Sequence, residues 1–467
     1  MSDTERITNL VEKYSELGNG KRLVFAYGDE IRYCAQLGGW LTWDGRRWCR
    51  DEVGGVMHRA KLTIRHLDAE VPRLENEQLK APLRTHINRS ERAASLRAMV
   101  ELAQSEPSLA VRSDQLDTDP WLLNCANGTV ELRTGVLQRH RQRDLITKLA
   151  PVAYDPNAQS DVFDNFLRSV TSGNEELVRF LQIAAGYTAI GINMEEKAFI
   201  LRGGTASGKS TFVEAVKATL GDYARTTDFE TLLRRNHSDG PRNDLARLKG
   251  ARMVSAGEVT PGRQLDEATI KALTGGDTIT ARFLHQEHFE FVPQFTLWLH
   301  VNHLPAVRDD DPAIWRRIVA VPFDNTIPAE DRDPSVKARL RDPKDGGRAV
   351  LRWIVEGALL YQREGLRIPD TVRKASEAYR SEMATFGAFI EDRCVEGPEQ
   401  WSATSNLTAA YHTWSNEQGY RFPYGAARIK EVLRGRGHSP QKRGGVRGWQ
   451  GIGLVGPTIR PAVKPAA

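Results

Sequence analysis

The sequence predicts an α/β protein whose middle part is built on a largely parallel sheet. Between residues 162 and 369, apolar segments of strand length alternate with helical patterns, which is typical of parallel strands joined by crossover helices. One apolar segment enters a glycine-rich loop, and a helical pattern leaves that loop. The expected strands are AFILRG, ARMVSAGE, FTLWLHVN and RIVAVPF.

Length and composition limit the class of protein. A chain of 467 residues is expected to form about three domains. Hydrophobic residues make up 40% and charged residues 27%, which favours a soluble globular protein. No apolar run approaches the ~20 residues of a membrane span, and the start MSDTERITNL does not resemble a signal peptide. We therefore expect a cytoplasmic protein that does not bind membranes.

The four cysteines are widely spaced and form no CxxC pair. This spacing argues against a disulfide framework and against a zinc ribbon. Buried thiols in a reducing compartment are the expected state.

Three folded regions and a tail are expected. The first combines short strands around a turn at Asp44-Gly45 with a charged helical stretch and the strand TVEL, which indicates an α+β domain. The second is the α/β core. The third joins helical patterns to a glycine-rich hairpin around Trp449, an order typical of a winged-helix domain. The expected boundaries are residues 1–160, 161–370 and 381–456, with a disordered tail over 457–467.

The end of the chain is basic. From Trp401 onward ten lysines and arginines are opposed only by Glu417 and Glu431. Such a segment suits contact with a phosphate backbone. A merely solvated tail is the alternative interpretation.

The strongest motif is GGTASGKST, which matches the phosphate-loop pattern G-x-x-x-x-G-K-[ST]. Glycines let successive backbone N–H groups point at phosphates, and the following helix N-terminus favours negative charge. Lys209 is expected at the β- and γ-phosphates, and the Ser210 hydroxyl at Mg²⁺. The motif therefore predicts a nucleoside triphosphatase. The predicted nucleotide-binding residues are Gly203, Gly204, Thr205, Ala206, Ser207, Gly208, Lys209, Ser210 and Thr211.

Polar residues at three later strands complete the expected site. Glu258 ends an apolar strand about fifty residues after the loop, where a carboxylate can order Mg²⁺ and the attacking water. Asn302 ends the next strand and is expected to sense the γ-phosphate. Arg316 and Arg317 precede the last strand and suit an arginine finger that acts on a neighbouring subunit in a ring. A surface ion pair is the alternative for either arginine.

This order of motifs resembles the superfamily 3 helicases, and more closely the phage and plasmid primase–helicase branch that includes the poxvirus-type NTPase. The segments IKALTGGDTITARFLHQEHFEFVP and DPWLLNCANGTVELRTGVLQRH are similar to parts of that family. The resemblance implies an AAA+-like P-loop NTPase core that uses ATP and Mg²⁺. It also implies a replicative helicase that moves on single-stranded DNA as a hexameric ring.

The resemblance assigns roles to individual residues. Lys209 and Ser210 would hold phosphates and Mg²⁺, Glu258 the metal and water, and Asn302 would be the sensor. Arg317 is the first candidate for the finger and Arg316 the second. The DNA-facing hairpin is expected at residues 281–291, and its candidate DNA contacts, with the segment before it, are Lys271, Arg282, His285 and His288.

One position departs from the family pattern. Many relatives carry two adjacent acids where this chain has Gly257 before Glu258, so Asp277 or another carboxylate would have to assist.

Four histidines, His285, His288, His300 and His303, resemble a metal box. Strand positions three apart face opposite sides, and we do not expect a metal site there.

Other functions stay open at this point. The chain could be a nucleotide-gated replication adaptor, or the helicase half of a primase–helicase whose primase is a separate chain. A primase is disfavoured, because the first 160 residues show no zinc-binding cysteines. A small-molecule kinase is disfavoured by the expected winged helix. The expected partners are single-stranded and forked DNA, further copies of the chain, and a separate primase or polymerase, in a bacterial host that carries a phage or mobile element.

Overall fold

The computed structural model describes residues 13–234, 243–257, 263–282, 288–307, 312–418 and 423–455. The chain forms two compact units. Unit 1 contains Met1–Leu132 and Val136–Tyr154, and unit 2 contains Arg133–Gly135 and Asp155–Ala467. Glu258, His285 and the predicted disordered tail lie outside the described residues.

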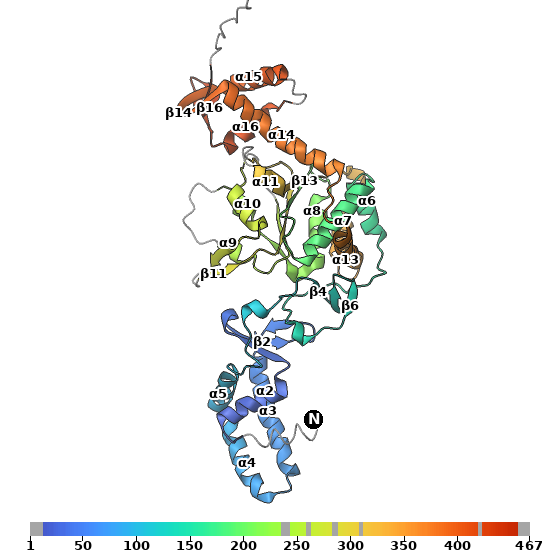
Figure 1. Ribbon diagram of the computed structural model, residues 1–467, viewed down its shortest axis with the longest axis vertical. Helices are drawn as coiled ribbons and strands as arrows, with labels where there is room; N and C mark the ends of the chain where they lie inside the picture. Colours follow the sequence, from blue (N-terminus) through green and yellow to red (C-terminus); the bar gives the residue numbers. More distant parts are fainter. Residues whose placement is uncertain are drawn as a thin grey trace, which may run out of the picture. The chain divides into compact units, whose positions relative to one another are not determined.

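Unit 1 combines a helical part with two small antiparallel sheets, β1-β2-β3 and β4-β5-β6 (Figure 1). The turn predicted at Asp44-Gly45 joins β2 to β3: Gly45 has φ +95°, and the Asp44 carboxylate accepts bonds from the N–H groups of Arg46 and Arg47, both 2.8 Å. Trp48 is buried in the core of the first sheet. The elements are α2 (Glu16–Tyr27), β1 (Ile31–Cys34), β2 (Gly39–Trp43), β3 (Trp48–Arg50), α3 (Gly55–Glu70), α4 (Glu77–Ser90), α5 (Ala93–Ala103), β4 (Leu122–Cys125), β5 (Gly128–Glu131) and β6 (Val136–Gln138).

The described part of unit 2 contains a five-stranded parallel sheet, here the central sheet, in the order β13-β7-β12-β9-β8. Its strands are nearly continuous apolar runs, as expected for parallel strands covered on both faces. The mixed α/β class with a parallel sheet is therefore confirmed. The strands are β7 (Ala198–Arg202), β8 (Ala224–Thr226), β9 (Met253–Gly257), β12 (Thr296–Val301) and β13 (Ile318–Pro322).

Helices cover both faces of the central sheet. Figure 1 shows α7 and α13 on one side of it and α10 on the other. On the first side Trp298 packs against Phe199 and Phe212, with ring centroids 4.7 and 5.8 Å apart. On the second side Ile200 and its neighbours pack in one core with Ile270 of α10. The helices are α6 (Asp161–Val170), α7 (Glu175–Ile190), α8 (Lys209–Leu220), α9 (Asn243–Ala246), α10 (Glu267–Thr274), α11 (Pro312–Arg317), α12 (Ser335–Arg341) and α13 (Gly346–Glu364).

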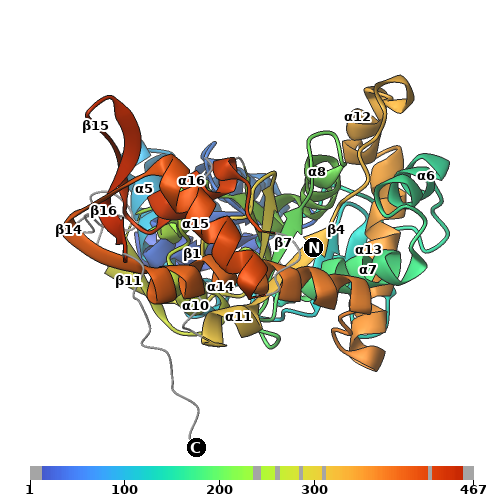
Figure 2. The same ribbon diagram turned by 90° about the horizontal axis from the view of Figure 1, so that it is seen from above.

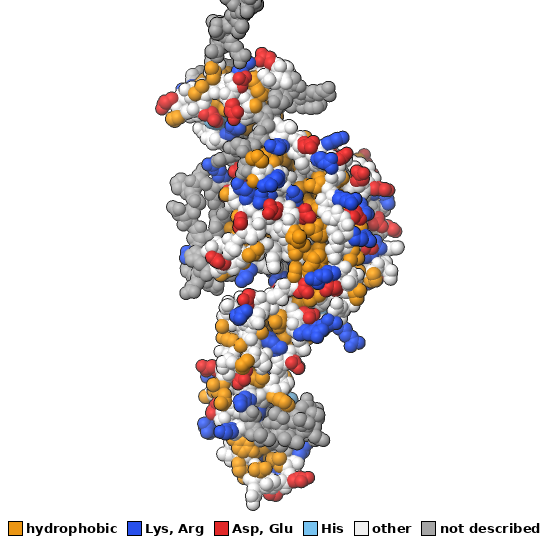
Figure 3. Space-filling view, in the orientation of Figure 1, with side chains coloured by type: hydrophobic (Ala, Val, Ile, Leu, Met, Phe, Trp, Pro, Cys, Tyr) orange, Lys and Arg blue, Asp and Glu red, His pale blue; other side chains and the backbone are white. Residues whose placement is uncertain are grey.

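Glycines allow α7 and α13 to pack backbone against backbone. A Cβ added at Gly186 would lie 2.0 Å from the Ala358 nitrogen, and one at Gly357 would lie 2.0 Å from the Gln182 carbonyl oxygen. Neither helix tolerates a side chain at this crossing. On the outer surface near α6 and α7, basic and acidic side chains are intermixed (Figure 3).

The last part of unit 2 is a helical cluster with a three-stranded antiparallel sheet, β14-β16-β15. The predicted helices and the hairpin around Trp449 are present, and Figure 2 shows β15 projecting beyond α15 and α16. The long strand β14 was not predicted. The elements are α14 (Asp370–Arg393), β14 (Cys394–Ala403), α15 (Thr404–Glu417), α16 (Ala426–Gly435), β15 (Ser439–Arg443) and β16 (Val446–Leu454).

Helix α14 belongs to two cores. Its first half packs on the central sheet: the Ser376 hydroxyl accepts a bond from Ala320 N–H at 3.0 Å, and the Tyr379 hydroxyl donates to the Pro305 carbonyl at 2.5 Å. Its second half contributes Phe386 and Phe389 to the core of the last part. Among the helices of the described residues, none is both long and apolar enough to cross a membrane.

Candidate functional site

The register of the central sheet brings the predicted strand ends together. Val301 lies opposite Arg202, and His300 lies opposite Gly257. Since neighbouring strands are ~4.8 Å apart, the chain leaves β7, β12 and β9 side by side at one edge, which we call the loop edge. Ligands of open α/β sheets bind outside this carboxyl edge. Gly203 and Asn302 therefore lie close together at the loop edge. Gly257, the residue before Glu258, ends β9 at the same edge.

Two glycines give the loop after β7 its shape. A Cβ at Gly203 would lie 2.0 Å from the Phe323 carbonyl oxygen, and one at Gly208 would lie 2.3 Å from Cγ1 of Val170. Gly208 also has φ +86°, a left-handed conformation that favours glycine. The loop is thus held between α6 and the chain after β13, and glycine is required at both ends.

Lys209 begins α8 and turns its amine back into the loop. Its Nζ donates to the carbonyls of Gly203 and Gly204, both at 2.7 Å, and to the Ser207 hydroxyl at 2.9 Å. Burial lowers the pKa of Lys209. Among the described residues its acceptors are all neutral, so an anion at this place would be favoured.

The remaining loop residues leave room for a ligand. Thr205 and Ser210 are exposed, whereas Ala206 and Thr211 are half-buried. An exposed Ser210 hydroxyl at the helix N-terminus fits the predicted Mg²⁺ contact. Ala206 has φ +62°, and its carbonyl accepts a bond from Ile327 N–H at 3.1 Å, which fixes the loop from outside.

Two cavities flank the loop, and Arg202 and Asp324 line both. These two side chains form an ion pair at 3.5 Å. The smaller cavity, about 340 Å³, also contains Asn302 and His303, which are exposed at the end of β12. Its lining is Arg202, Gly203, Gly204, Asn302, His303, Leu304, Asp324 and Glu431.

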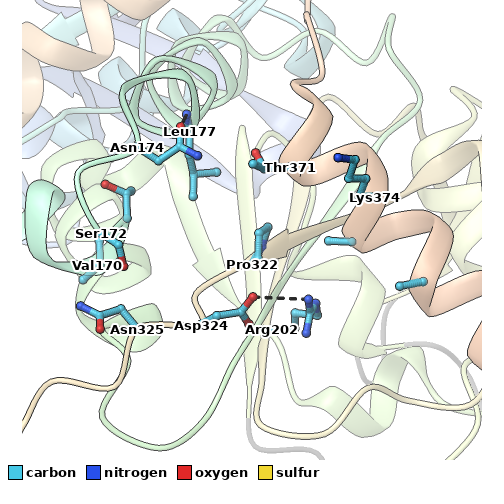
Figure 4. A pocket seen from close by; sticks show the side chains of 13 residues that line it. Val170, Ser172, Asn174, Leu177, Arg202, Pro322, Asp324, Asn325, Thr371 and Lys374 are labelled. Atoms are coloured by element: carbon cyan, nitrogen blue, oxygen red, sulfur yellow. Dashed lines mark hydrogen bonds and ion pairs between the residues drawn. The ribbon is translucent and has the colours of Figure 1, made fainter. Parts of the chain in front are cut away.

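The larger cavity, about 510 Å³, lies between the α6–α7 turn, the end of β13 and the start of α14 (Figure 4). Ser172 and Asn174 face it from the turn, and Thr371 and Lys374 face it from α14. Asn325 ties the chain after β13 to α6, since its Nδ2 donates to the Ser169 carbonyl at 2.6 Å. Apolar and polar side chains together line this cavity, which suits a small organic ligand.

His300 explains why the chain has glycine at position 257. A Cβ at Gly257 would lie 1.9 Å from Cε1 of His300, so the imidazole fills the space of a side chain at that position. Sequence reasoning considered His300 only as part of a metal box. The signal that could have identified His300 is its position as a polar residue inside an otherwise apolar strand, where the structure leaves it half-buried.

Asp277 lies beside one of the candidate finger arginines. The Cβ position of Gly275 lies 3.4 Å from an Arg317 nitrogen and 3.5 Å from an Asp277 oxygen, which places Asp277 beside Arg317. Arg317 directly precedes β13 and so lies at the amino edge of the central sheet, opposite the loop edge. Asp277 thus lies toward the amino edge, while Glu258 lies outside the described residues, and assistance by Asp277 or another carboxylate stays a prediction.

The two candidate finger arginines differ in their surroundings. Arg317 bonds to Glu196 at 2.9 Å and to the Ala313 carbonyl at 3.0 Å, and only 13% of its side chain is exposed. Arg316 is exposed, and its carbonyl accepts a bond from Lys197 Nζ at 2.6 Å. The backbone of α11 is thus fixed while the Arg316 guanidinium faces solvent.

The predicted hairpin is present as β10 (Ile279–Arg282) and β11 (His288–Phe291). Arg282 pairs with His288 in the register, directly before the tip. The tip itself, with His285, lies outside the described residues. Lys271 is half-buried on α10, which leads into this hairpin.

Comparisons with known proteins find two family models and several viral relatives. A family model described as "D5 N terminal like" matches residues 20–172, and one described as a family of unknown function (DUF5906) matches residues 201–317. "Putative helicase L207/L206" of Acanthamoeba polyphaga mimivirus is 28% identical over 302 residues, which cover 60% of this chain and 31% of the relative. "Putative helicase 022R" of Frog virus 3 is 25% identical over 394 residues, 68% of this chain and 40% of the relative.

The chain thus spans 31% and 40% of the lengths of these two relatives. Among solved structures, the apo NrS-1 C terminal region matches with a TM-score of 0.40 and 11% identity, over 68% of this chain and 80% of that one. The resemblance predicted from the sequence is confirmed: the chain is related to the superfamily 3 helicases of the phage and viral primase–helicase type.

Proposed function

We propose that this protein is the ATP-hydrolysing motor of a ring-forming DNA helicase. The observation that carries the proposal is the loop edge, where a buried lysine on neutral acceptors, a helix N-terminus and Asn302 converge. The relatives named as helicases support DNA as the substrate. The translocation of single-stranded DNA through a hexamer is part of the proposal.

ATP and Mg²⁺ fit the residues at this edge. Lys209 would exchange the carbonyls of Gly203 and Gly204 for the β- and γ-phosphates, and Ser210 would hold Mg²⁺ together with Glu258. Asn302 would orient the attacking water. The 510 Å³ cavity beside the loop would receive the nucleoside, with Asn174 and Thr371 as hydrogen-bonding groups.

The finger must act on a neighbouring subunit. The strand β13 has five residues and is therefore about 16 Å long. It separates the arginines at its start from the loop edge at its end, a distance longer than an arginine side chain. We assign the finger to Arg316, since its side chain is exposed, and we assign Arg317 to holding α11 in place through Glu196.

DNA would be contacted at two places in unit 2. The β10–β11 hairpin would couple ATP hydrolysis to movement through Lys271, Arg282, His285 and His288. The last part of the chain, with helices followed by the β15–β16 hairpin, would act as a winged-helix domain that supplies affinity. A separate primase or polymerase would complete the replication machinery.

The decisive experiment measures ATP hydrolysis and the unwinding of a forked DNA for the wild type and for Lys209→Ala. We expect Lys209→Ala to lower hydrolysis by about two to three orders of magnitude and to abolish unwinding, because the phosphates lose their buried cation. Lys217→Ala is the matched control, since Lys217 lies on the same helix and pairs with Glu214 at 2.6 Å. Wild-type hydrolysis by Lys209→Ala would refute the motor assignment. DNA-stimulated hydrolysis without strand displacement would instead indicate a nucleotide-gated replication adaptor.

A further inference from the structure

Two segments of unit 1 that are far apart in the sequence meet beside its small sheets. The first is the β2–β3 turn with Arg46, and the second is the stretch after β6, residues 139–148. Trp48 joins them twice: its N–H donates to the Ile146 carbonyl and its indole Nε1 to the Gln142 carbonyl, both at 2.9 Å. The two segments therefore form one surface.

A fully buried asparagine holds the two segments of this surface together. Asn124 is 0% exposed, and its Nδ2 donates to the carbonyls of Arg46 and Lys148 at 3.0 and 2.9 Å. Its Oδ1 contacts His140 Nδ1 at 2.8 Å and accepts a bond from the Thr129 hydroxyl at 3.1 Å. One side chain thus fixes the backbone of both segments and the ring of His140.

The inward position of His140 turns its neighbours outward. Side chains alternate along an extended chain, and both Arg139 and Arg141 are exposed while His140 is half-buried. Burial lowers the pKa of His140, and nearby Arg46 adds to the lowering. The ring is accordingly neutral at physiological pH, and the positive charge of the surface comes from the arginines.

Acidic side chains near these arginines are already engaged. The Asp44 carboxylate accepts bonds from two N–H groups of its turn and from the Cys49 thiol. Asp144 lies 4.0 Å from Arg143, whose side chain is 76% exposed. Figure 3 shows Lys and Arg side chains gathered around β6 and the adjoining chain.

We infer that Arg46, Arg139, Arg141 and Arg143 form a DNA-binding surface on unit 1, the arginine platform, which contacts the sugar–phosphate backbone without reading sequence. Exposed guanidiniums on a rigid backbone are pre-ordered donors for phosphate oxygens. Phosphate contacts of this kind position a protein on DNA and add salt-dependent affinity. The inference rests on the proposed function, which supplies DNA as the polyanion.

The test compares the full-length wild type with the triple variant Arg46→Ala, Arg139→Ala, Arg141→Ala by fluorescence anisotropy on labelled oligothymidine. We expect about tenfold weaker binding at low salt, and a slope of log K against log salt that is smaller by about 2, since each lost contact removes ~0.7 for single strands. ATP hydrolysis without DNA should not change. A second variant with glutamine at the same positions keeps the side-chain stems and should give the same result.

The matched control removes the same charge elsewhere on unit 1. Arg65, Arg84 and Arg97 are exposed on α3, α4 and α5, and their triple alanine variant should keep the wild-type slope. An unchanged salt slope in the platform variants, or an equal decrease of the slope in the control, would overturn the inference. The proposed function would still hold in that case if the wild type unwinds DNA. Competition by oligoglutamate as strong as that by unlabelled oligothymidine would also overturn it, in favour of an acidic protein partner. If the wild type neither binds oligothymidine nor unwinds DNA, the proposed function itself fails.

Discussion

The two edges of the central sheet are built in different ways. The loop edge consists of backbone in close contact, with Gly203 and Gly208 packed against neighbouring atoms at distances that exclude a side chain. The amino edge of β13 is held by charged side chains, with Arg317 bonded to Glu196 and Lys197 to the end of α11. At the loop edge, close backbone contacts determine the shape of the candidate site. At the amino edge, the exposed Arg316 extends from α11, whose backbone is held by these bonds.

Under the proposed function, this difference would divide the site between neighbouring subunits. The loop edge and Arg316 lie at opposite ends of strands in one sheet, so a single chain would carry two incomplete halves of the proposed site. Closed rings of identical subunits join such halves by head-to-tail interfaces. The backbone at the amino edge also has an uncommon conformation. Glu196 has φ +53°, which is rare for a residue other than glycine and indicates that this segment is held in a fixed geometry.

The largest effect should come from the exposed arginine. We expect Arg316→Ala to bind ATP like the wild type and to hydrolyse it about 10³-fold more slowly, the size of a lost arginine finger. Mixing it with Lys209→Ala subunits should restore part of the activity, because some interfaces then pair an intact loop with an intact finger. Steady-state ATPase assays over a range of mixing ratios measure this.

Arg317→Ala is the matched control for that experiment. It breaks the bond to Glu196, so we expect a lower unfolding temperature and a smaller loss of hydrolysis that mixing does not restore. If Arg317→Ala shows the rescue and Arg316→Ala does not, the two roles are exchanged. Absence of rescue in both, with normal assembly, would contradict a finger that acts between subunits.

A smaller effect should follow a change at the acidic strand. Gly257→Asp recreates the paired acids of many relatives, but its Cβ would lie 1.9 Å from His300. We expect a loss of about 1–3 kcal/mol in the free energy of unfolding, as for an overpacked core, and reduced ATP hydrolysis. His300→Ala in the same chain should recover the stability. Thermal unfolding and ATPase assays report both, and a stable, fully active Gly257→Asp would show that the ring can move away without cost.

The sequence predicts those elements whose signals are local. The strands β7, β9, β12 and β13 are long apolar runs, and the loop between β7 and α8 follows a spaced motif, so each appears in a short window. The strands β8 and β14 are among those missed, because their windows are atypical. The strand β8 has three residues, and β14 reads CVEGPEQWSA, with a glycine, a proline and a register shift between Glu396 and Trp401.

Features set by distant partners could not be predicted. Arg316 and Arg317 are adjacent and chemically identical, and they differ in their partners, among them Glu196, 121 positions before Arg317. The placement of β12 between β7 and β9 likewise depends on pairing and not on local pattern. The arginine platform could not be predicted, because its charges are divided between Arg46 and a segment more than ninety residues later. Asn124 joins these two parts of the chain only in the folded structure. The roles of Glu258, Asn302 and His285 stay predictions.

The smallest expected effect concerns the β15–β16 hairpin. Lys442 and Arg447 are exposed and face each other in the register, beside Arg443, which lies over the Trp401 ring at 5.8 Å. Removal of the segment after Glu382 would cut α14 and expose Phe386 and Phe389, so charge removal is the cleaner experiment. The double variant Lys442→Ala, Arg447→Ala should lower the salt slope of oligothymidine binding by about 1.4, for two lost contacts at ~0.7 each. ATP hydrolysis without DNA should stay at the wild-type rate, because the motor is untouched. A wild-type slope would indicate that this hairpin serves assembly or partner docking, and would leave the arginine platform and the β10–β11 hairpin as the DNA contacts.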